Sequence, residues 1–184
     1  TLRKARAGVS IQLAALAKGY GVDAVAEALA DLGWTDFMVE IGGDLRAEGR
    51  NARGEAWRIG IERPMAHART VQEVIALSGQ GMATSGDYRN YFEADGTRYA
   101  HVLDAKTGRP VDHGTVSVTV LAEDAVHADA WATALLALGV DRGLEIAERW
   151  HLAAMFISRG EQDAERFDIV VSERFAQVRG AQAH

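Results

Sequence analysis

The chain has 184 residues, 48% of them hydrophobic, which is enough for one domain with a substantial core. It contains no cysteine, which excludes disulfides, iron–sulfur clusters and thiolate zinc sites. A net charge of −6 without a basic stripe argues against nucleic acid as a partner. We also expect no membrane-spanning segment and no signal peptide, because no apolar run is long enough for either reading.

The first half of the chain is predicted to mix strands with one long helix. Residues 9–13 are predicted as a strand, and residues 18–32 as an amphipathic helix that ends at Gly33. The Gly42-Gly43 pair indicates a hairpin turn or a close backbone approach. The strands predicted around and after it are 37–41, 45–48, 57–62 and 71–78.

The second half is predicted to continue in the same mixed pattern. Asp95-Gly96 is a strong hairpin signal between strands at 91–94 and 97–103. A strand at 115–121 precedes a helix that ends at Gly139, and a second helix follows at 141–150. The last predicted elements are strands at 152–157 and 167–171, then a short or frayed helix after Ser172.

Asp129 stands out because it lies in a helical run, residues 125–138, that is otherwise almost entirely apolar. Thr133 follows four residues later, so both side-chain oxygens lie on one helical face. An ionised carboxylate that faces a core is unfavourable unless a positive or donating group meets it. Two hard oxygen ligands on one face suit Mg²⁺. The alternative is an aspartate at the solvent edge of a buried helix, with Thr133 bonded to its own backbone.

Three other motifs carry groups suited to phosphate binding or proton transfer. Lys18, at a predicted helix start, could hold a phosphate together with the backbone amides there, or be a solvated lysine. Thr84-Ser85-Gly86 offers hydroxyls to a phosphate, or is a turn that ends a strand. His101 is either a base or a packed strand histidine. The sequence contains no P-loop, GxGxxG, HExxH or CxxC motif.

Taken together, these motifs resemble those of the ApbE family of FAD:protein FMN transferases. Five short motifs occur in the family's order, and the resemblance runs from about Ile11 to Gly160. The motifs are Lys18-Gly-Tyr20, Ile41-Gly-Gly-Asp44, Thr84-Ser-Gly-Asp87, His101-Val-Leu-Asp104 with Thr107-Gly108, and Ala128-Asp-Ala-Trp-Ala-Thr133.

The resemblance implies an α+β fold of mixed sheets with packed helices, in which residues 1–184 form a single ApbE-like domain without the family's N-terminal segment. It implies a metal site at the Ala15 carbonyl, Asp129 and Thr133. It places Lys18 and Gln12 at FAD and Val102 beside the flavin. From the residues themselves, Gly43 would permit the ligand's approach and the Ser85 hydroxyl would suit its phosphate.

The implied reaction transfers FMN from FAD to a Ser or Thr hydroxyl of a partner flavoprotein, and AMP leaves. His101 is the implied catalytic residue, near the acceptor hydroxyl. Mg²⁺ is the implied cofactor and FAD the donor substrate. Because the pyrophosphate is anionic and the chain is acidic, the site must be locally positive, which Lys18 and a cation would provide. The family resemblance also implies a periplasmic or membrane-associated location.

Two departures from the family pattern keep alternatives open. The family has an aspartate six residues before the lysine, where this chain has Gln12, so that position loses its charge. The family's N-terminal segment also supplies flavin and adenine contacts, so the chain is either a fragment or a short variant that binds FAD incompletely. The alternative functions are hydrolysis of FAD to FMN and AMP, and a non-catalytic flavin-binding assembly module.

Overall fold

In the computed structural model, the description covers residues 3–65, 70–87, 91–94, 97–100, 102–104, 106–160 and 166–181; for 91–94 and 97–100 it covers the backbone alone. These residues form an α+β fold, as expected. Its elements are α1 (Ala14–Asp31), β1 (Phe37–Ile41), β2 (Asp44–Glu48), β3 (Trp57–Glu62), β4 (Val71–Leu77), β5 (Gln80–Gly86), β6 (Tyr91–Ala94), β7 (Thr97–Ala100), β8 (Thr115–Ala122), α2 (Ala125–Arg149), β9 (Ala153–Arg159), β10 (Phe167–Val171) and α3 (Glu173–Ala181).

The centre of the fold is a six-stranded sheet in the order β1-β2-β5-β8-β9-β10, in which every neighbouring pair is antiparallel. The pairs β3–β4 and β6–β7 form separate two-stranded sheets. Strand β8 is buried at every position from 115 to 121. A strand is buried on both faces only when each face of its sheet is covered, and this is the case here.

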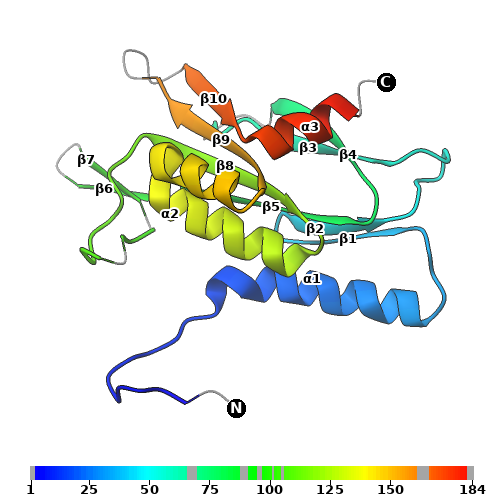
Figure 1. Cartoon of the computed structure of the whole chain (residues 1–184), viewed down its shortest axis with the longest axis horizontal. Helices are drawn as coiled ribbons and strands as arrows, with labels where there is room; N and C mark the ends of the chain where they lie inside the picture. The colour runs from blue at the N-terminus through cyan, green and yellow to red at the C-terminus, as the bar shows by residue number, and fades with distance from the viewer. Residues whose placement is uncertain are drawn as a thin grey trace.

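Figure 1 shows the two coverings of the sheet: α2 lies on one face with α1 beside it, and α3 and the β3–β4 hairpin lie on the other. The core is accordingly divided by the sheet. One cluster joins α2 to the sheet and includes Leu135, Leu136, Val118, Val120 and Phe156. The other joins β3, β4 and α3 to the opposite face and includes Ile61, Ile75, Leu77, Met155 and Phe175. No helix among the described residues is long and apolar enough to cross a membrane.

Three sequence-based predictions of elements need correction. Residues 9–13 form no strand, because Val9, Ile11 and Leu13 are 48–60% exposed and pair with no neighbouring strand. Helix α1 begins at Ala14, one turn before the predicted start at residue 18. Strand β5, which carries Thr84 and Ser85, was predicted only as a possible strand end. Its Gly81 and Gly86 give it a weak local preference for strand, and its pairing with β2 and β8 overrides that preference.

The predicted hairpin at 91–103 is confirmed in part. Strands β6 and β7 pair from Tyr91–Ala100 to Ala94–Thr97, but β7 ends at Ala100, and Leu103 instead forms an isolated bridge with Pro110. The turn at 95–96 lies outside the described residues. The helices predicted at 125–138 and 141–150 are confirmed as the two segments of α2, which meet at Gly139, where φ of 71° and ψ of 173° are not helical. The Val140 amide, just after this break, donates to Thr115 Oγ1 at 2.9 Å, so it keeps a partner although the helical hydrogen-bond pattern is interrupted.

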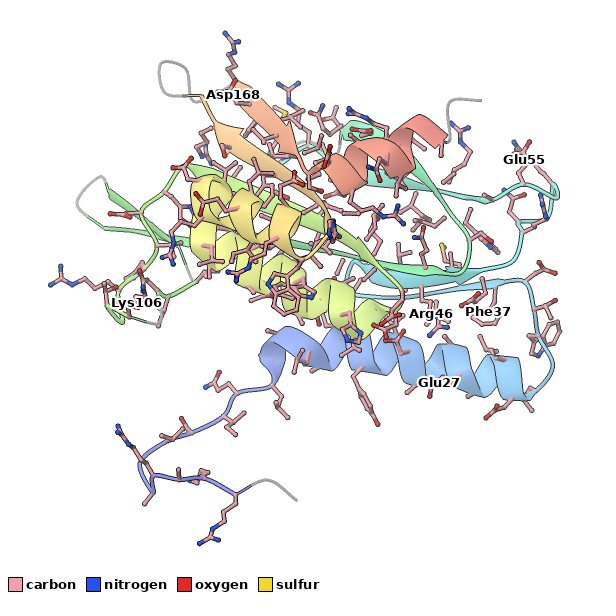
Figure 2. All side chains as sticks on the ribbon, in the orientation of Figure 1. Glu27, Phe37, Arg46, Glu55, Lys106 and Asp168 are labelled. Carbon is pink, nitrogen blue, oxygen red and sulfur yellow. The ribbon has the colours of Figure 1, made fainter. Side chains whose placement is uncertain are left out.

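The N-terminus of α2 is held by a residue from α1. The first amides of a helix have no partner inside it. Here Asp23 Oδ1 accepts from the Ala125 amide at 3.0 Å and Asp23 Oδ2 from the Val126 amide at 2.8 Å. The N-cap residue Asp124 accepts from the next amide. Arg46 of β2 approaches Asp23 at 3.4 Å, and Figure 2 shows Arg46 beside the start of α2, above α1. Asp23 therefore ties α1, α2 and β2 together.

Replacing Asp23 should destabilise the whole domain. In Asp23→Ala the Ala125 and Val126 amides lose their acceptor, and an unmet buried donor costs about 1–3 kcal/mol. We expect the free energy of unfolding, measured by urea titration followed by circular dichroism, to fall by about that amount. Asp31→Ala is the control, because Asp31 is an exposed aspartate in the last turn of the same helix, where removing a negative charge is neutral or slightly favourable. Equal stability of the two variants would contradict this role for Asp23.

Candidate active site

A cavity of about 910 Å³ lies where α1, α2, β5 and the β1–β2 turn meet. Its volume is in the range of small-molecule and cofactor sites. Every predicted site residue that the structure describes lines it: Gln12, Ala15, Lys18, Gly43, Ser85, Val102, Asp129 and Thr133. His101, the predicted catalytic residue, lies outside the described residues, while its neighbour Val102 is on the cavity wall.

Asp129 is 2% exposed, so it does not sit at a solvent edge, and that alternative is wrong. Its Oδ2 accepts a hydrogen bond from the Gly19 amide at 3.1 Å. A side chain at Gly19 would clash with the Ala125 carbonyl, so glycine is what lets α1 approach α2 closely enough for this bond. In a regular α-helix the residue 19 amide bonds to the carbonyl of residue 15. Asp129 therefore accepts from the same amide that, in a regular helix, donates to the Ala15 carbonyl.

Thr133 follows Asp129 by one helical turn and faces the same cavity. Its Oγ1 lies 3.0 Å from Ser85 Oγ of β5, with either hydroxyl able to donate. The Thr133 hydroxyl is thus hydrogen-bonded to the Ser85 side chain, and not to its own backbone as the alternative had it. If the Thr133 lone pairs turn towards a cation, its proton can be donated to Ser85. Ser85 therefore orients Thr133, as outer partners of metal ligands do.

Lys18 reaches the cavity from the second turn of α1, so its predicted position at the helix start is wrong, while its role at a phosphate stays a prediction. Its Nζ forms an ion pair with Asp44 Oδ2 at 2.8 Å, and its side chain is 42% exposed. The stem passes under the β1–β2 turn, where a Cβ on Gly42 would lie 3.3 Å from Lys18 Cδ. Gly42 and Gly43 have φ of 59° and 95°, as a tight two-residue hairpin turn requires. The hairpin interpretation is therefore confirmed.

Sequence analysis assigned no role to Asp44 of this site. It is 1% exposed, and among the described residues the Lys18 ammonium, 2.8 Å from Oδ2, is the group that meets its negative charge. The pKa of Asp44 is raised to about 6, chiefly by burial and also by the nearby charge of Asp129, against the lowering effect of Lys18. The only sequence signal for Asp44 was its place in the Gly-Gly-Asp motif.

The arrangement can bind a hard cation and an anion side by side. The oxygens available are the Asp129 and Asp44 carboxylates, the Thr133 hydroxyl and the Ala15 carbonyl, and oxygen-only ligand sets suit Mg²⁺. The Asp44 carboxylate fits such an ion, because it is buried and, among the described residues, its charge is met by the partly exposed Lys18 ammonium alone. Lys18 adds an ammonium for an anionic group. Glu40 of β1, also missed from the sequence, lines the cavity and accepts from the Gly43 amide at 2.6 Å.

A second group of potential metal ligands, Glu123, Asp124 and His127, lies at the surface near the start of α2. Asp124 Oδ1 accepts from the His127 amide at 2.8 Å and lies 2.7 Å from His127 Nδ1. Capping of α2 by Asp124 accounts for these contacts, and His127 is an exposed surface residue.

Comparison with known proteins identifies the family of this chain. The sequence model of the ApbE family matches residues 1–156. The chain belongs to the ApbE family. An FAD:protein FMN transferase of Haemophilus influenzae is 49% identical over 160 residues, which are 86% of this chain and 46% of the relative. That of Salmonella typhimurium is 38% identical over 174 residues, 95% of this chain and 49% of the relative. This ApbE chain thus spans about half the length of the curated relatives it matches.

Solved structures show the same fold. The apo form of the Pseudomonas stutzeri flavinyl transferase ApbE aligns with a TM-score of 0.81 and 42% sequence identity, over 92% of this chain and 51% of that one. The ApbE protein of Thermotoga maritima aligns with a TM-score of 0.80 and 36% identity, over 94% of this chain and 54% of that one. The expected ApbE-like fold is therefore confirmed for this ApbE chain.

The raised pKa of Asp44 predicts how stability depends on pH in the metal-free protein. Between about pH 4 and pH 6 the folded state holds a proton on Asp44 that the unfolded chain, with a pKa near 3.8, has released. The folded state is therefore favoured at low pH, and this contribution is lost as the pH rises through 6. Urea titrations in EDTA should show the unfolding free energy of the wild type falling over this window relative to Asp44→Asn. Parallel curves of unfolding free energy against pH for the two proteins would contradict the raised pKa of Asp44.

Proposed function

We propose that this ApbE chain provides the cation- and pyrophosphate-binding part of an FAD:protein FMN transferase. The reaction moves FMN from FAD to a Ser or Thr hydroxyl of a partner flavoprotein and releases AMP. The observation that carries the proposal is the cavity in which the Lys18 ammonium lies beside an oxygen-only face made by Asp129, Thr133 and Ala15. The names of the family's characterised members, FAD:protein FMN transferases, support it.

The residues of the cavity divide the binding of FAD among them. Asp129, Thr133 and the Ala15 carbonyl would hold Mg²⁺, which when bound neutralises charge on the pyrophosphate. Lys18 would approach the same pyrophosphate with its ammonium group. The Gly42-Gly43 turn has no side chains and leaves room for the phosphates beside Lys18. Val102 would line the flavin site, and Gln12 would donate or accept a hydrogen bond as a neutral amide.

His101 is the proposed general base. The acceptor hydroxyl oxygen attacks the FMN phosphorus, the bond from phosphorus to the AMP oxygen breaks, and the hydroxyl proton passes to His101. The support for this role is that the next residue, Val102, lines the cavity. Phosphoryl transfer needs mainly positioning and charge stabilisation, with a base for the nucleophile, and the cavity is suited to each of these.

The direct test measures the mass of an acceptor peptide. The chain is incubated with FAD, MgCl₂ and a peptide that contains one Ser or Thr acceptor, and the peptide is examined by mass spectrometry for the addition of one FMN. Because the chain spans about half of its relatives, a hybrid is run in parallel, in which it replaces the matched half of the Haemophilus influenzae relative. Transfer by the hybrid supports the proposal. Release of FMN and AMP without modified peptide supports hydrolysis instead, and neither product, with FAD bound, supports a non-catalytic flavin-binding module.

Asp129→Ala should abolish magnesium dependence while leaving the fold intact. It removes a charged ligand, and the loss of outer-shell partners alone costs about 10–100-fold in metal affinity or activity. We expect the Mg²⁺-dependent rate of the hybrid to fall by more than about 100-fold, and Thr133→Val to have a smaller effect, because a neutral oxygen contributes less. Circular dichroism checks the fold. A variant that unfolds more easily yet keeps its Mg²⁺ affinity would identify Asp129 as a purely structural residue.

His101→Ala should separate binding from turnover. A base acts on the acceptor hydroxyl and not on FAD, so FAD affinity measured by calorimetry should be unchanged. The transfer rate should fall by about 10²–10⁴-fold, the usual contribution of general-base catalysis. The matched control is His127→Ala, which changes an exposed histidine outside the cavity. An equal loss of FAD affinity and rate in His101→Ala would show that His101 binds the ligand and is not the base.

A further inference from the structure

Lys18, which lines the cavity, forms an ion pair with Asp44 beside it, and the Lys18 side chain is much more exposed than that of Asp44. The Asp44 side chain is 1% exposed and held at the start of β2, directly after the glycine turn. Lys18 is 42% exposed, and its long stem leaves it free to move. Asp44 is therefore the fixed partner of the pair, and Lys18 is the partner that can leave.

The charges of the cluster are unbalanced. Asp44 and Asp129 lie close enough for each other's charge to matter, and Lys18 is the cation that the structure places against them. With all three groups ionised the cluster carries one net negative charge. A divalent cation between the carboxylates would turn that into one net positive charge. Positive charge is what an anionic pyrophosphate requires, since the chain as a whole is acidic.

We propose that Asp44 is a further carboxylate of the cation site and that Lys18 occupies it only while the site is empty. In this arrangement the incoming cation would bind Asp44, directly or through one of its water molecules, and would displace the Lys18 ammonium. Lys18 then turns into the cavity, where it meets the anionic group of the substrate. Cation and anion binding are thereby coupled through one ion pair, and the coupling is reciprocal. The proposal rests on the magnesium-dependent function proposed above.

The arrangement makes two predictions of opposite sign for the binding of Mg²⁺ alone. Asp44→Asn keeps the shape of the side chain and removes its charge, so the Mg²⁺ dissociation constant should rise by about tenfold or more. Lys18→Met removes the ion that competes for Asp44, so the same constant should fall, on the order of fivefold. A purely structural Lys18–Asp44 pair would give neither result.

The experiment is calorimetric titration of MgCl₂ into the 184-residue chain without FAD, for wild type, Asp44→Asn, Lys18→Met and the control Asp168→Asn. Asp168 lies on β10, and Figure 2 shows it on the opposite side of the molecule from α1, so its substitution changes the net charge and one exposed ion pair with Arg166, away from the site. Circular dichroism confirms folding of each variant. Asp168→Asn should bind Mg²⁺ like the wild type.

The outcomes separate this inference from the proposed function. Weaker binding in Asp44→Asn together with tighter binding in Lys18→Met supports it. The inference is overturned if the wild type binds Mg²⁺ normally and the Mg²⁺ dissociation constant of Asp44→Asn is unchanged. It is also overturned if Lys18→Met binds Mg²⁺ more weakly than the wild type. Either result leaves the proposed function standing. Absence of Mg²⁺ binding by the wild-type chain overturns the magnesium part of the proposed function, and this inference with it.

A second titration examines the coupling itself, with inorganic pyrophosphate as the anion. Pyrophosphate should bind the wild type more tightly at saturating Mg²⁺ than in EDTA, because the cation frees Lys18. In Lys18→Met this gain in pyrophosphate affinity should be smaller. Magnesium also forms a complex with pyrophosphate in solution, but this effect is the same for both proteins and cancels when they are compared in the presence of Mg²⁺. An equal gain in the two proteins would overturn the displacement of Lys18.

Discussion

The close contact between α1 and α2 is the constraint on which the rest of the site depends. Gly19 permits the approach, because any side chain there would strike the Ala125 carbonyl. Two carboxylates on opposite helices then fix the contact: Asp23 of α1 accepts from the first amides of α2, and Asp129 of α2 accepts from the Gly19 amide. Each helix thus supplies an acceptor for the other's backbone. The register of the two helices is set by hydrogen bonds that no apolar packing could specify as sharply.

The same contact explains how residues far apart in sequence form one cavity. Asp129 lies 110 residues after Gly19, whose amide donates a hydrogen bond to its carboxylate. The sheet supplies the other walls, since β5 brings Ser85 to Thr133, and the β1–β2 turn brings Gly43 and Asp44 to Lys18. Structural and site residues therefore overlap. A substitution that shifts α2 by a fraction of a turn would move Asp129 and Thr133 together, because they share one helical face.

The sequence predicted most elements of the fold because their signals are local. The alternation in β3, the break at Gly139 and the glycine turn of the first hairpin are each decided by a few neighbouring residues. The errors concern features that depend on distant partners. Residues 9–13 have the composition of a strand but no neighbouring strand to pair with, whereas β5 is weak locally and forms because β2 and β8 flank it. Tertiary context decides such segments.

The site residues show the same division between local signals and distant partners. Asp129 was found because a carboxylate in an apolar helix is a local anomaly, and Thr133 because helical spacing puts it on the same face. Lys18 and Ser85 lie in short motifs suited to phosphate, which the family resemblance joined to these two residues. Asp44 was missed because nothing near it in sequence shows that β2 is buried at its first residue. Asp23 could have been found, since it lies on the buried face of α1 with Gly19, Val22 and Ala26. A carboxylate at helical spacing within a buried stripe needs a partner, just as Asp129 does.

The charged cluster departs from what stability alone would favour. The buried carboxylates of Asp44 and Asp129 lie close enough for their charges to interact, and the partly exposed Lys18 offsets only part of that charge. Replacing such a cluster by apolar side chains often stabilises a protein. Its presence beside a cavity of ligand size is expected where local stability is given up for binding. The ligand that relieves the repulsion would then stabilise the folded state, so the proposed cation would act on both folding and binding.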